Sequence, residues 1–160
     1  MFEKKEYIMD STFGVCMVEK VTKLVVGREQ QMEYYVLQSA ADKKKKAYIP
    51  VQNHETVLRR LITPEQATSI LEKIKVEINT NNKEEMEALT VEEARGVLES
   101  GDPDSWAKVS SYLLQREGEL SPPVVGILEK IWEQLQNELA FVLKKSRDDI
   151  TIHAAGSAGY

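Results

Sequence analysis

The stretch at residues 32–39, MEYYVLQS, decides how the first third of the chain is interpreted. Tyr34, Tyr35 and Val36 are aromatic or β-branched residues, which fit a pleated, half-buried surface and disfavour a helix. Neither Gly nor Pro interrupts the stretch. Side chains alternate between the two faces of a strand, and both faces are largely apolar here. The pattern therefore predicts a central strand of a small closed sheet and not an edge strand.

Further strands are predicted on both sides of this stretch, at residues 6–10, 15–26 and 47–51. Polar turns separate them, and Gly14 gives the first turn its backbone freedom. Pro50 cannot donate a ladder hydrogen bond, so we expect it at an edge or at a strand end. Four strands in hairpin order indicate a small antiparallel barrel or a strongly bent sheet.

From residue 52 onward the apolar residues follow the period of helices. Thr63 and Gln66 form a capping box, which predicts the start of a helix that runs to about residue 75. Thr90 and Glu93 form a second capping box, and the helix that follows it is expected to end at Gly101. Two longer helices are predicted over residues 102–115 and 122–145.

Trp106 and Trp132 lie on the apolar faces of these last two helices, where core packing is the favoured role. The polar run NTNN predicts a linker near residues 79–83. The tail at residues 146–160 is poor in apolar residues and is expected to be loose.

The expected architecture is α+β and has two parts. A small antiparallel β domain is assigned to residues 1–52, and an all-helical domain to residues 53–145. The chain has 160 residues, enough for one domain or two small ones.

Composition places the chain among ordinary globular proteins. No apolar run approaches the roughly 20 residues that span a bilayer, so no membrane association is expected. The N-terminus lacks an apolar signal core, and the single cysteine, Cys16, cannot form an internal disulfide. A cytoplasmic protein is therefore expected.

The net charge of −5 is unevenly spread along the chain. Residues 1–50 hold nine Lys/Arg and seven Asp/Glu, whereas residues 51–160 hold twelve and nineteen. A strongly acidic second half is a poor general binder of nucleic acid. The four lysines at 43–46 form either a solvated turn that discourages edge pairing or a contact for an acidic protein surface or a phosphate backbone; the solvated turn is favoured.

Signals for an enzyme are weak. His54 and His153 are far apart in sequence, and a Cys–His pair with Cys16 is less favoured than a buried structural cysteine. The sequence has no glycine-rich phosphate loop and no Cys/His cluster with metal-ligand spacing. We therefore expect no catalytic, cofactor-binding or metal-binding residues, no small-molecule ligand and no enzymatic function.

Several short motifs occur together in a fixed order and resemble the CarD/CdnL family of bacterial transcription regulators. They are MFEK at 1–4, FGV at 13–15, EYYVL at 33–37, YIPVQN at 48–53, LRRLI at 58–62, LESGD at 98–102, ELS at 119–121 and NELA at 137–140. The resemblance implies an N-terminal Tudor-like domain, shared with transcription-repair coupling factors, that binds the β subunit of RNA polymerase. It also implies a helical C-terminal domain whose tryptophan wedges into the minor groove of promoter DNA and stabilises the open complex.

The polymerase-facing strands of the family correspond to two short groups of residues in this chain. These polymerase-binding candidates are Lys23, Leu24, Val25, Lys46, Ala47 and Tyr48. Relatives often carry arginine where this chain has Leu24 and Tyr48. Strand-to-strand pairing uses backbone groups and would survive those changes, whereas the charge contacts would depend on the nearby lysines.

The DNA-facing part departs further from the family pattern. The wedge tryptophan should lie shortly before the helix that ends at Gly101, but this chain has NKEEME at 82–87. Lys83 and Met86 are the weak DNA-binding candidates left there, and promoter contact is expected to be weak or indirect. The first functional hypothesis is a polymerase-associated regulator of initiation without the wedge. The alternative is a protein-interaction adaptor that uses the Tudor-like domain on a non-polymerase partner.

Overall fold

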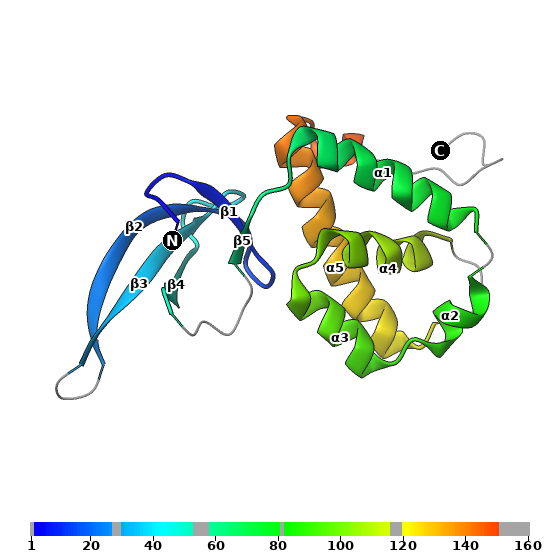
Figure 1. Cartoon of the computed structure of the whole chain (residues 1–160), viewed down its shortest axis with the longest axis horizontal. Helices are drawn as coiled ribbons and strands as arrows, with labels where there is room; N and C mark the ends of the chain where they lie inside the picture. Colours follow the sequence, from blue (N-terminus) through cyan, green and yellow to red (C-terminus); the bar gives the residue numbers. More distant parts are fainter. Residues whose placement is uncertain (1, 27–29, 53–57, 81, 116–119, 151–160) are drawn as a thin grey trace. The chain divides into compact units, whose positions relative to one another are not determined.

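The computed structural model in Figure 1 describes residues 2–26, 30–52, 58–80, 82–115 and 120–150. The side chains of residues 24–26, 30 and 31 are not among the described features. Contacts divide the chain into two compact units, Met1–Leu61 (unit 1) and Ile62–Tyr160 (unit 2). Within the described residues, no helix combines the length and the apolar character needed to cross a bilayer.

Unit 1 is a five-stranded antiparallel sheet with the order β4-β3-β2-β1-β5. Its strands are β1 (Tyr7–Asp10), β2 (Gly14–Val26), β3 (Gln30–Ser39), β4 (Lys46–Pro50) and β5 (Leu58–Arg60). β3 lies between β2 and β4, which confirms the predicted central strand. Pro50 ends β4, and β4 is an end strand of the order, as expected for a residue without an N–H.

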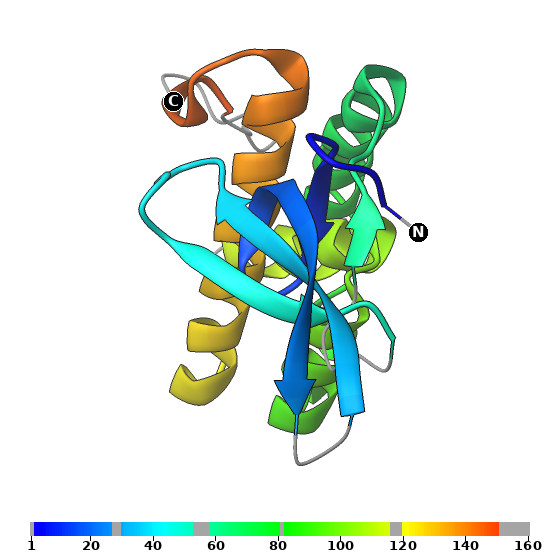
Figure 2. The same cartoon turned by 90° about the vertical axis from the view of Figure 1, so that its left-hand side faces the viewer.

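Two local features shape the long strands. Gly14 has a φ of 93°, a value that glycine adopts without steric cost, and it closes the turn between β1 and β2. The register between β2 and β3 shifts between Val18 and Lys20, so Glu19 is an extra residue in β2. Such a bulge bends the strand and increases its twist. Figures 1 and 2 both show β2 and β3 extending together as a long curved pair.

A buried hydrophobic cluster of unit 1 lies on one face of the sheet. Ile8, Cys16, Val18, Tyr35 and Leu37 form this cluster. The thiol of Cys16 lies 3.7 Å from the carbonyl oxygen of Ile8, and burial raises its pKa to about 12. The expected burial of Cys16 is thus confirmed. His54 and His153 lie outside the described residues.

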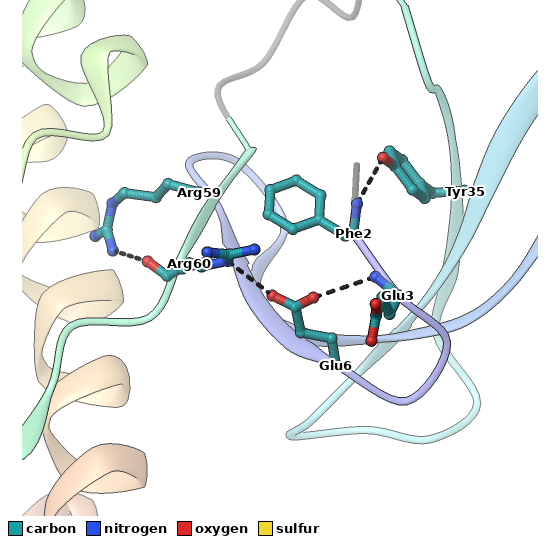
Figure 3. A network of polar contacts seen from close by, with 6 residues as sticks. All are labelled: Phe2, Glu3, Glu6, Tyr35, Arg59 and Arg60. Atoms are coloured by element: carbon teal, nitrogen blue, oxygen red, sulfur yellow. Dashed lines mark hydrogen bonds and ion pairs between the residues drawn. The ribbon is translucent and has the colours of Figure 1, made fainter.

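The segment before β1 is joined to both β3 and β5 (Figure 3). The backbone N–H of Phe2 donates to the Tyr35 hydroxyl at 3.0 Å, and the two rings lie 5.8 Å apart. The Glu6 carboxylate accepts the N–H of Glu3 at 3.1 Å and pairs with Nε of Arg60 at 3.3 Å. These contacts fix the N-terminal residues along the sheet.

Unit 2 is helical throughout its described residues, which confirms the α+β class. Its elements are α1 (Pro64–Ile78), α2 (Lys83–Ala88), α3 (Val91–Ser100), α4 (Pro103–Gln115), α5 (Pro122–Leu143) and the 3₁₀ turn η1 (Arg147–Asp149). Both predicted capping boxes are present, at Thr63 with Gln66 and at Thr90 with Glu93. Gly101 ends α3 with a φ of 64°, as predicted.

The core of unit 2 forms where α1 packs against α4 and α5, and α3 packs against α5. Its largest buried side chains include Ile74, Met86, Trp106, Leu128, Ile131, Leu135 and Leu139. The indole N–H of Trp106 donates to the carbonyl oxygen of Val97 at 2.8 Å, so this side chain ties α4 to α3. Its predicted core role is confirmed, whereas Trp132 is only half-buried.

The division between the units differs from the sequence-based one after residue 52. β5 pairs with β1, so residues 58–60 belong to unit 1 and the division follows Leu61. The linker predicted near residues 79–83 lies inside unit 2, between α1 and α2. There Asn79 Nδ2 donates to the Lys75 carbonyl and the Thr80 hydroxyl to the Val76 carbonyl, each at 2.8 Å, which satisfies the end of α1.

The first residues of the predicted loose tail are held by α5. Gln136 Nε2 donates to the carbonyl oxygens of Arg147 at 3.1 Å and Ile150 at 3.2 Å. The Ile150 side chain is buried, which explains why this short segment docks. Residues 151–160 lie outside the described part of the chain.

Candidate functional site

The outer half of β2 has an open backbone edge. β1 pairs with β2 only up to Met17, and the pairing ends at Val18, whose N–H donates to the carbonyl oxygen of Glu6 at 2.9 Å. Among the described residues, β2 pairs with β3 alone from Lys20 to Val26. A row of backbone groups on the side of β2 that faces away from β3 therefore has no strand from the described part of the chain beside it.

The register shows which residues point their backbone groups to this open edge. The carbonyl oxygen of Glu33 accepts the N–H of Val51 at 2.9 Å, so it points toward β4 and away from β2. Residues that face each other in an antiparallel pair exchange either both hydrogen bonds or none. Lys23 faces Glu33 and therefore points its N–H and carbonyl outward. Alternation along the strand gives the same direction to Val21 and Val25, and the opposite direction to Leu24.

The side chains near this edge combine positive charge with an apolar group. Lys20 and Lys23 are exposed, and Val21 is 37% exposed. The side chains of Leu24 and Val25 lie outside the described features, although their backbones are in β2. The sequence alone did not single out Lys20 and Val21. The signal that identifies them is the loss of a neighbouring strand after the bulge.

β4 carries the other three polymerase-binding candidates. Lys46 is exposed, and its Nζ lies 3.0 Å from the Glu19 carboxylate, so its charge is compensated within unit 1. Ala47 is half-buried and packs against the core cluster. Tyr48 is 55% exposed, and because it faces Val36, whose backbone groups point toward β2, its own N–H points out from the sheet.

The six polymerase-binding candidates do not lie along one edge. β3 separates β2 from β4, and the two groups also lie opposite different parts of β3, since residues 23–25 face residues 31–33 and residues 46–48 face residues 36–38. A single added strand can pair with only one of the two edges. The structure therefore brings together Lys23, Leu24 and Val25, and separately Lys46, Ala47 and Tyr48.

The lysine-rich turn between β3 and β4 is internally hydrogen-bonded. Lys44 N–H donates to the Asp42 carboxylate at 3.0 Å, Lys45 N–H donates to the Asp42 carbonyl at 3.0 Å, and Gln38 Nε2 donates to the Lys43 carbonyl at 3.0 Å. All four lysine side chains are exposed. This is the geometry of a solvated turn, and it leaves the ammonium groups of residues 43–45 directed to solvent.

The DNA-binding candidates lie on α2, and the structure corrects one of them. Met86 is only 1% exposed and belongs to the core of unit 2, so it cannot reach a base step while α2 is packed. Lys83 is exposed, and its Nζ lies 3.8 Å from the Glu87 carboxylate. Packing in unit 2 places the single large apolar residue of NKEEME inward.

A carboxylate on α2 also joins this helix to α4. Glu85 lies 3.2 Å from Lys108 Nζ and accepts the Tyr112 hydroxyl at 3.4 Å. The hydrogen bond with Glu85 raises the pKa of Lys108, and burial raises the pKa of Tyr112. Both groups keep their protons at neutral pH, so they donate to Glu85 and hold α2 in place.

Two features of the part of the chain that the structure describes bear on metal and small-molecule binding. No group of three His, Cys, Asp or Glu side chains there could hold a metal ion. A cavity of about 420 Å³ lies between the starts of α1 and α4, lined by Ile62, Glu65, Gln66, Ser69, Ile70, Asp102, Pro103 and Asp104. Two of its carboxylates already have partners, since Asp102 caps α4 through Ser105 and Asp104 lies 3.6 Å from Lys73.

Comparison with known families identifies the type of domain that unit 1 forms. Residues 2–62 match the model of the CarD-like/TRCF RID domain. Unit 1 is a CarD-like RNA polymerase-interacting domain. The resemblance found in the sequence is thus confirmed for this part of the chain, and it gives the protein a transcription-related role. CarD-like domains of this family are protein-interaction modules, not catalytic ones.

The family match ends where the sheet ends. It includes β5, whose residues Leu58–Arg60 were not predicted as a strand, and it stops at the first residue of unit 2. No curated protein matches the chain. The family match therefore covers the sheet with its open edge, and it does not extend into the helices of unit 2.

Proposed function

We propose that this protein is a cytoplasmic transcription regulator that binds the β subunit of bacterial RNA polymerase through unit 1 and modulates initiation. The observation that carries the proposal is the open edge of β2. An extended segment of a partner can add to such an edge, with backbone hydrogen bonds supplying affinity and alternate side chains supplying specificity. The CarD-like match to residues 2–62 supports RNA polymerase as that partner.

The edge of β2 suits strand addition better than the edge of β4. Val21, Lys23 and Val25 each direct an N–H and a carbonyl outward along the seven residues of β2 that, among the described residues, pair with β3 alone. β4 has five residues, and its last, Pro50, has no N–H to offer. Exposed Lys20 and Lys23 flank the β2 edge and favour a partner strand that carries acidic side chains.

The second part of the proposal concerns promoter DNA. Unit 2 has ten Lys/Arg and eighteen Asp/Glu, and duplex affinity comes mainly from cations that replace counterions on phosphates. The tryptophan wedge that the family resemblance implies has no counterpart near Met86, which is buried. We therefore propose that unit 2 contacts promoter DNA weakly or indirectly.

A pair of proline variants tests the binding edge. Val25→Pro removes an outward N–H from β2 without removing a hydrogen bond to β3, whereas Tyr48→Pro does the same at the β4 edge. The full-length protein and both variants are titrated with the purified β subunit. We expect Val25→Pro to weaken binding by about tenfold or more, because the variant loses roughly one well-placed hydrogen bond to the partner strand and the strand register that this bond fixes. Tyr48→Pro should bind nearly as the unmodified chain does.

Other outcomes separate the alternatives. Loss of binding in Tyr48→Pro alone would move the site to β4 and keep the function. If the unmodified chain forms no complex with the β subunit at micromolar concentrations, the polymerase function is wrong, and the adaptor hypothesis with a different partner takes its place. Circular dichroism of each variant shows whether the sheet still forms.

A further inference from the structure

The connection between the two units runs from a paired strand to an anchored residue. On the side of unit 1, β5 pairs with β1, with Arg60 opposite Ile8. The guanidinium of Arg60 lies 3.3 Å from the Glu6 carboxylate, and Arg59 Nη1 donates to the Arg60 carbonyl at 3.1 Å (Figure 3). The chain is therefore held by backbone and side-chain contacts up to Arg60.

On the side of unit 2, the chain is held again from Ile62. The Ile62 side chain is 7% exposed, and its N–H donates to Oε2 of Glu138 at 3.1 Å. Glu138 lies on α5 and is fully buried. Thr63 follows directly, and its capping box with Gln66 closes both reciprocal hydrogen bonds, at 2.8 and 3.1 Å. Fixed structure therefore resumes one residue after Leu61.

We propose that the two units pivot at Leu61, and that Glu138 is the positioning residue that confines the pivot to this single position. A hydrogen bond from a backbone N–H to a buried carboxylate is stronger than one between neutral groups, and an unmade bond at a buried site is costly. Ile62 therefore moves with α5, and reorientation is limited to the soft dihedrals next to Leu61. This role does not depend on which partner unit 1 binds.

The alternative position for a pivot is the polar stretch near residues 79–83. Its described residues instead cap α1, and Asn82 Nδ2 and Gln115 Nε2 both donate to the Glu77 carbonyl, at 3.3 and 3.1 Å. These contacts join the end of α1 to α4, so the helices of unit 2 move together.

Amide hydrogen exchange and ¹⁵N relaxation of the full-length chain test the proposal. In the unmodified protein, the lowest order parameter between residues 58 and 66 should fall at Leu61, and the Ile62 amide should be protected. Glu138→Ala should speed exchange at Ile62 by about tenfold or more and lower its order parameter. Glu138→Gln keeps a carbonyl acceptor and should restore most of the protection. Glu133→Ala, which removes an exposed carboxylate from the same helix, is the matched control and should change neither quantity.

Two results would overturn the proposal. One is an Ile62 amide that exchanges equally fast with and without Glu138 in a folded protein. The other is an order-parameter minimum at residues 79–83 in place of Leu61. If Glu138→Ala does not fold, Leu61→Pro decides the matter, because a fixed φ at the pivot should bring the rotational correlation times of the two units closer together. Unchanged correlation times in that variant would contradict the pivot.

Discussion

The two units of this protein solve the same problem, the satisfaction of backbone polar groups, in opposite ways. Unit 2 satisfies the starts of α1 and α3 internally, with capping boxes at Thr63 and Thr90, and ends α3 with a left-handed Gly101. Unit 1 leaves the outer edge of β2 unpaired among its described residues. An open row of donors and acceptors invites another strand, whereas a closed helical bundle does not. The difference indicates that unit 1 is the part built for a partner.

The two units also differ in net charge. Unit 1 carries eleven Lys/Arg and eight Asp/Glu, and unit 2 carries ten and eighteen, so the net charges are +3 and −8. In unit 1 the carboxylates of Glu6 and Glu19 are paired with Arg60 and Lys46, which leaves other lysines exposed. A phosphate-rich partner is thus disfavoured by unit 2, and an acidic protein strand is favoured by unit 1.

The largest expected effect comes from a substitution that tests whether the two units are stable independently of each other. Trp106→Ala removes a fully buried indole and its hydrogen bond to Val97, so unit 2 should lose about 3–5 kcal/mol of stability. Thermal denaturation followed by circular dichroism should show a lower transition for the helices. Trp132→Ala, at a half-buried position on α5, should cost clearly less.

Binding of the same Trp106→Ala variant to the β subunit is the second measurement. Because the contacts divide the chain after Leu61, Trp106→Ala should still bind the β subunit with nearly unchanged affinity. Lost binding in a protein whose sheet remains folded would show that the units cooperate more than the comparison allows.

A smaller effect is expected at a helix start. In α3 the Thr90 hydroxyl accepts the N–H of Glu93 at 3.1 Å, and Thr90→Ala should cost about 1 kcal/mol of unfolding free energy in urea. Thr68 is exposed inside α1, where its hydroxyl donates to the Pro64 carbonyl, and Thr68→Ala should be close to neutral or slightly stabilising. An equal cost at both positions would mean that the cap does not stabilise α3.

Substitution of either of two exposed glycines should raise the stability of unit 2 instead of lowering it. A Cβ added at Gly96 in α3 or at Gly126 in α5 would meet nothing within 4 Å. Alanine at either position should therefore stabilise unit 2 by about 0.5–1 kcal/mol, because glycine loses more backbone entropy in a helix. The urea midpoint should rise without a change in slope. A fall in the midpoint would reveal that these helices need the freedom of glycine.

The smallest expected effect concerns DNA. Glu84 is exposed on α2, and Glu84→Lys reverses one charge of unit 2. Duplex affinity, measured by titration into a fluorescent promoter fork at moderate salt, should rise only about two- to threefold from a weak starting value. Tight binding by the unmodified chain would break the contrast between the units.

Local chemistry in the sequence predicted much of this fold. The alternation around Tyr35, the capping boxes and Gly101 depend on neighbours a few residues away, and each is present as predicted. β5 was missed because its three residues, LRR, carry no strand pattern and are a strand only through pairing with distant β1. The inward side of Met86 and the docking of Ile150 on α5 likewise depend on packing between distant segments.

The candidate site was predictable in part for the same reason. The family resemblance led to Lys23, Leu24 and Val25 and to Lys46, Ala47 and Tyr48, and the structure places these groups on either side of β3. Which of them adjoins an open edge depends on where the pairing of β2 with β1 ends, after Met17, and on the register after the Glu19 bulge. Neither can be read from the periodicity of β2 alone.

The position of Cys16 has a practical consequence when set beside the tryptophans. The chain has one cysteine, in the core of unit 1, and two tryptophans, both in unit 2. With a pKa raised to about 12 and no solvent exposure, the thiol is neutral and shielded at neutral pH, so a thiol reagent reaches it only when the sheet opens. Tryptophan emission reports on the helices alone. The natural sequence thus carries two orthogonal optical and chemical reporters, and the opening of each unit can be timed separately without introducing a label.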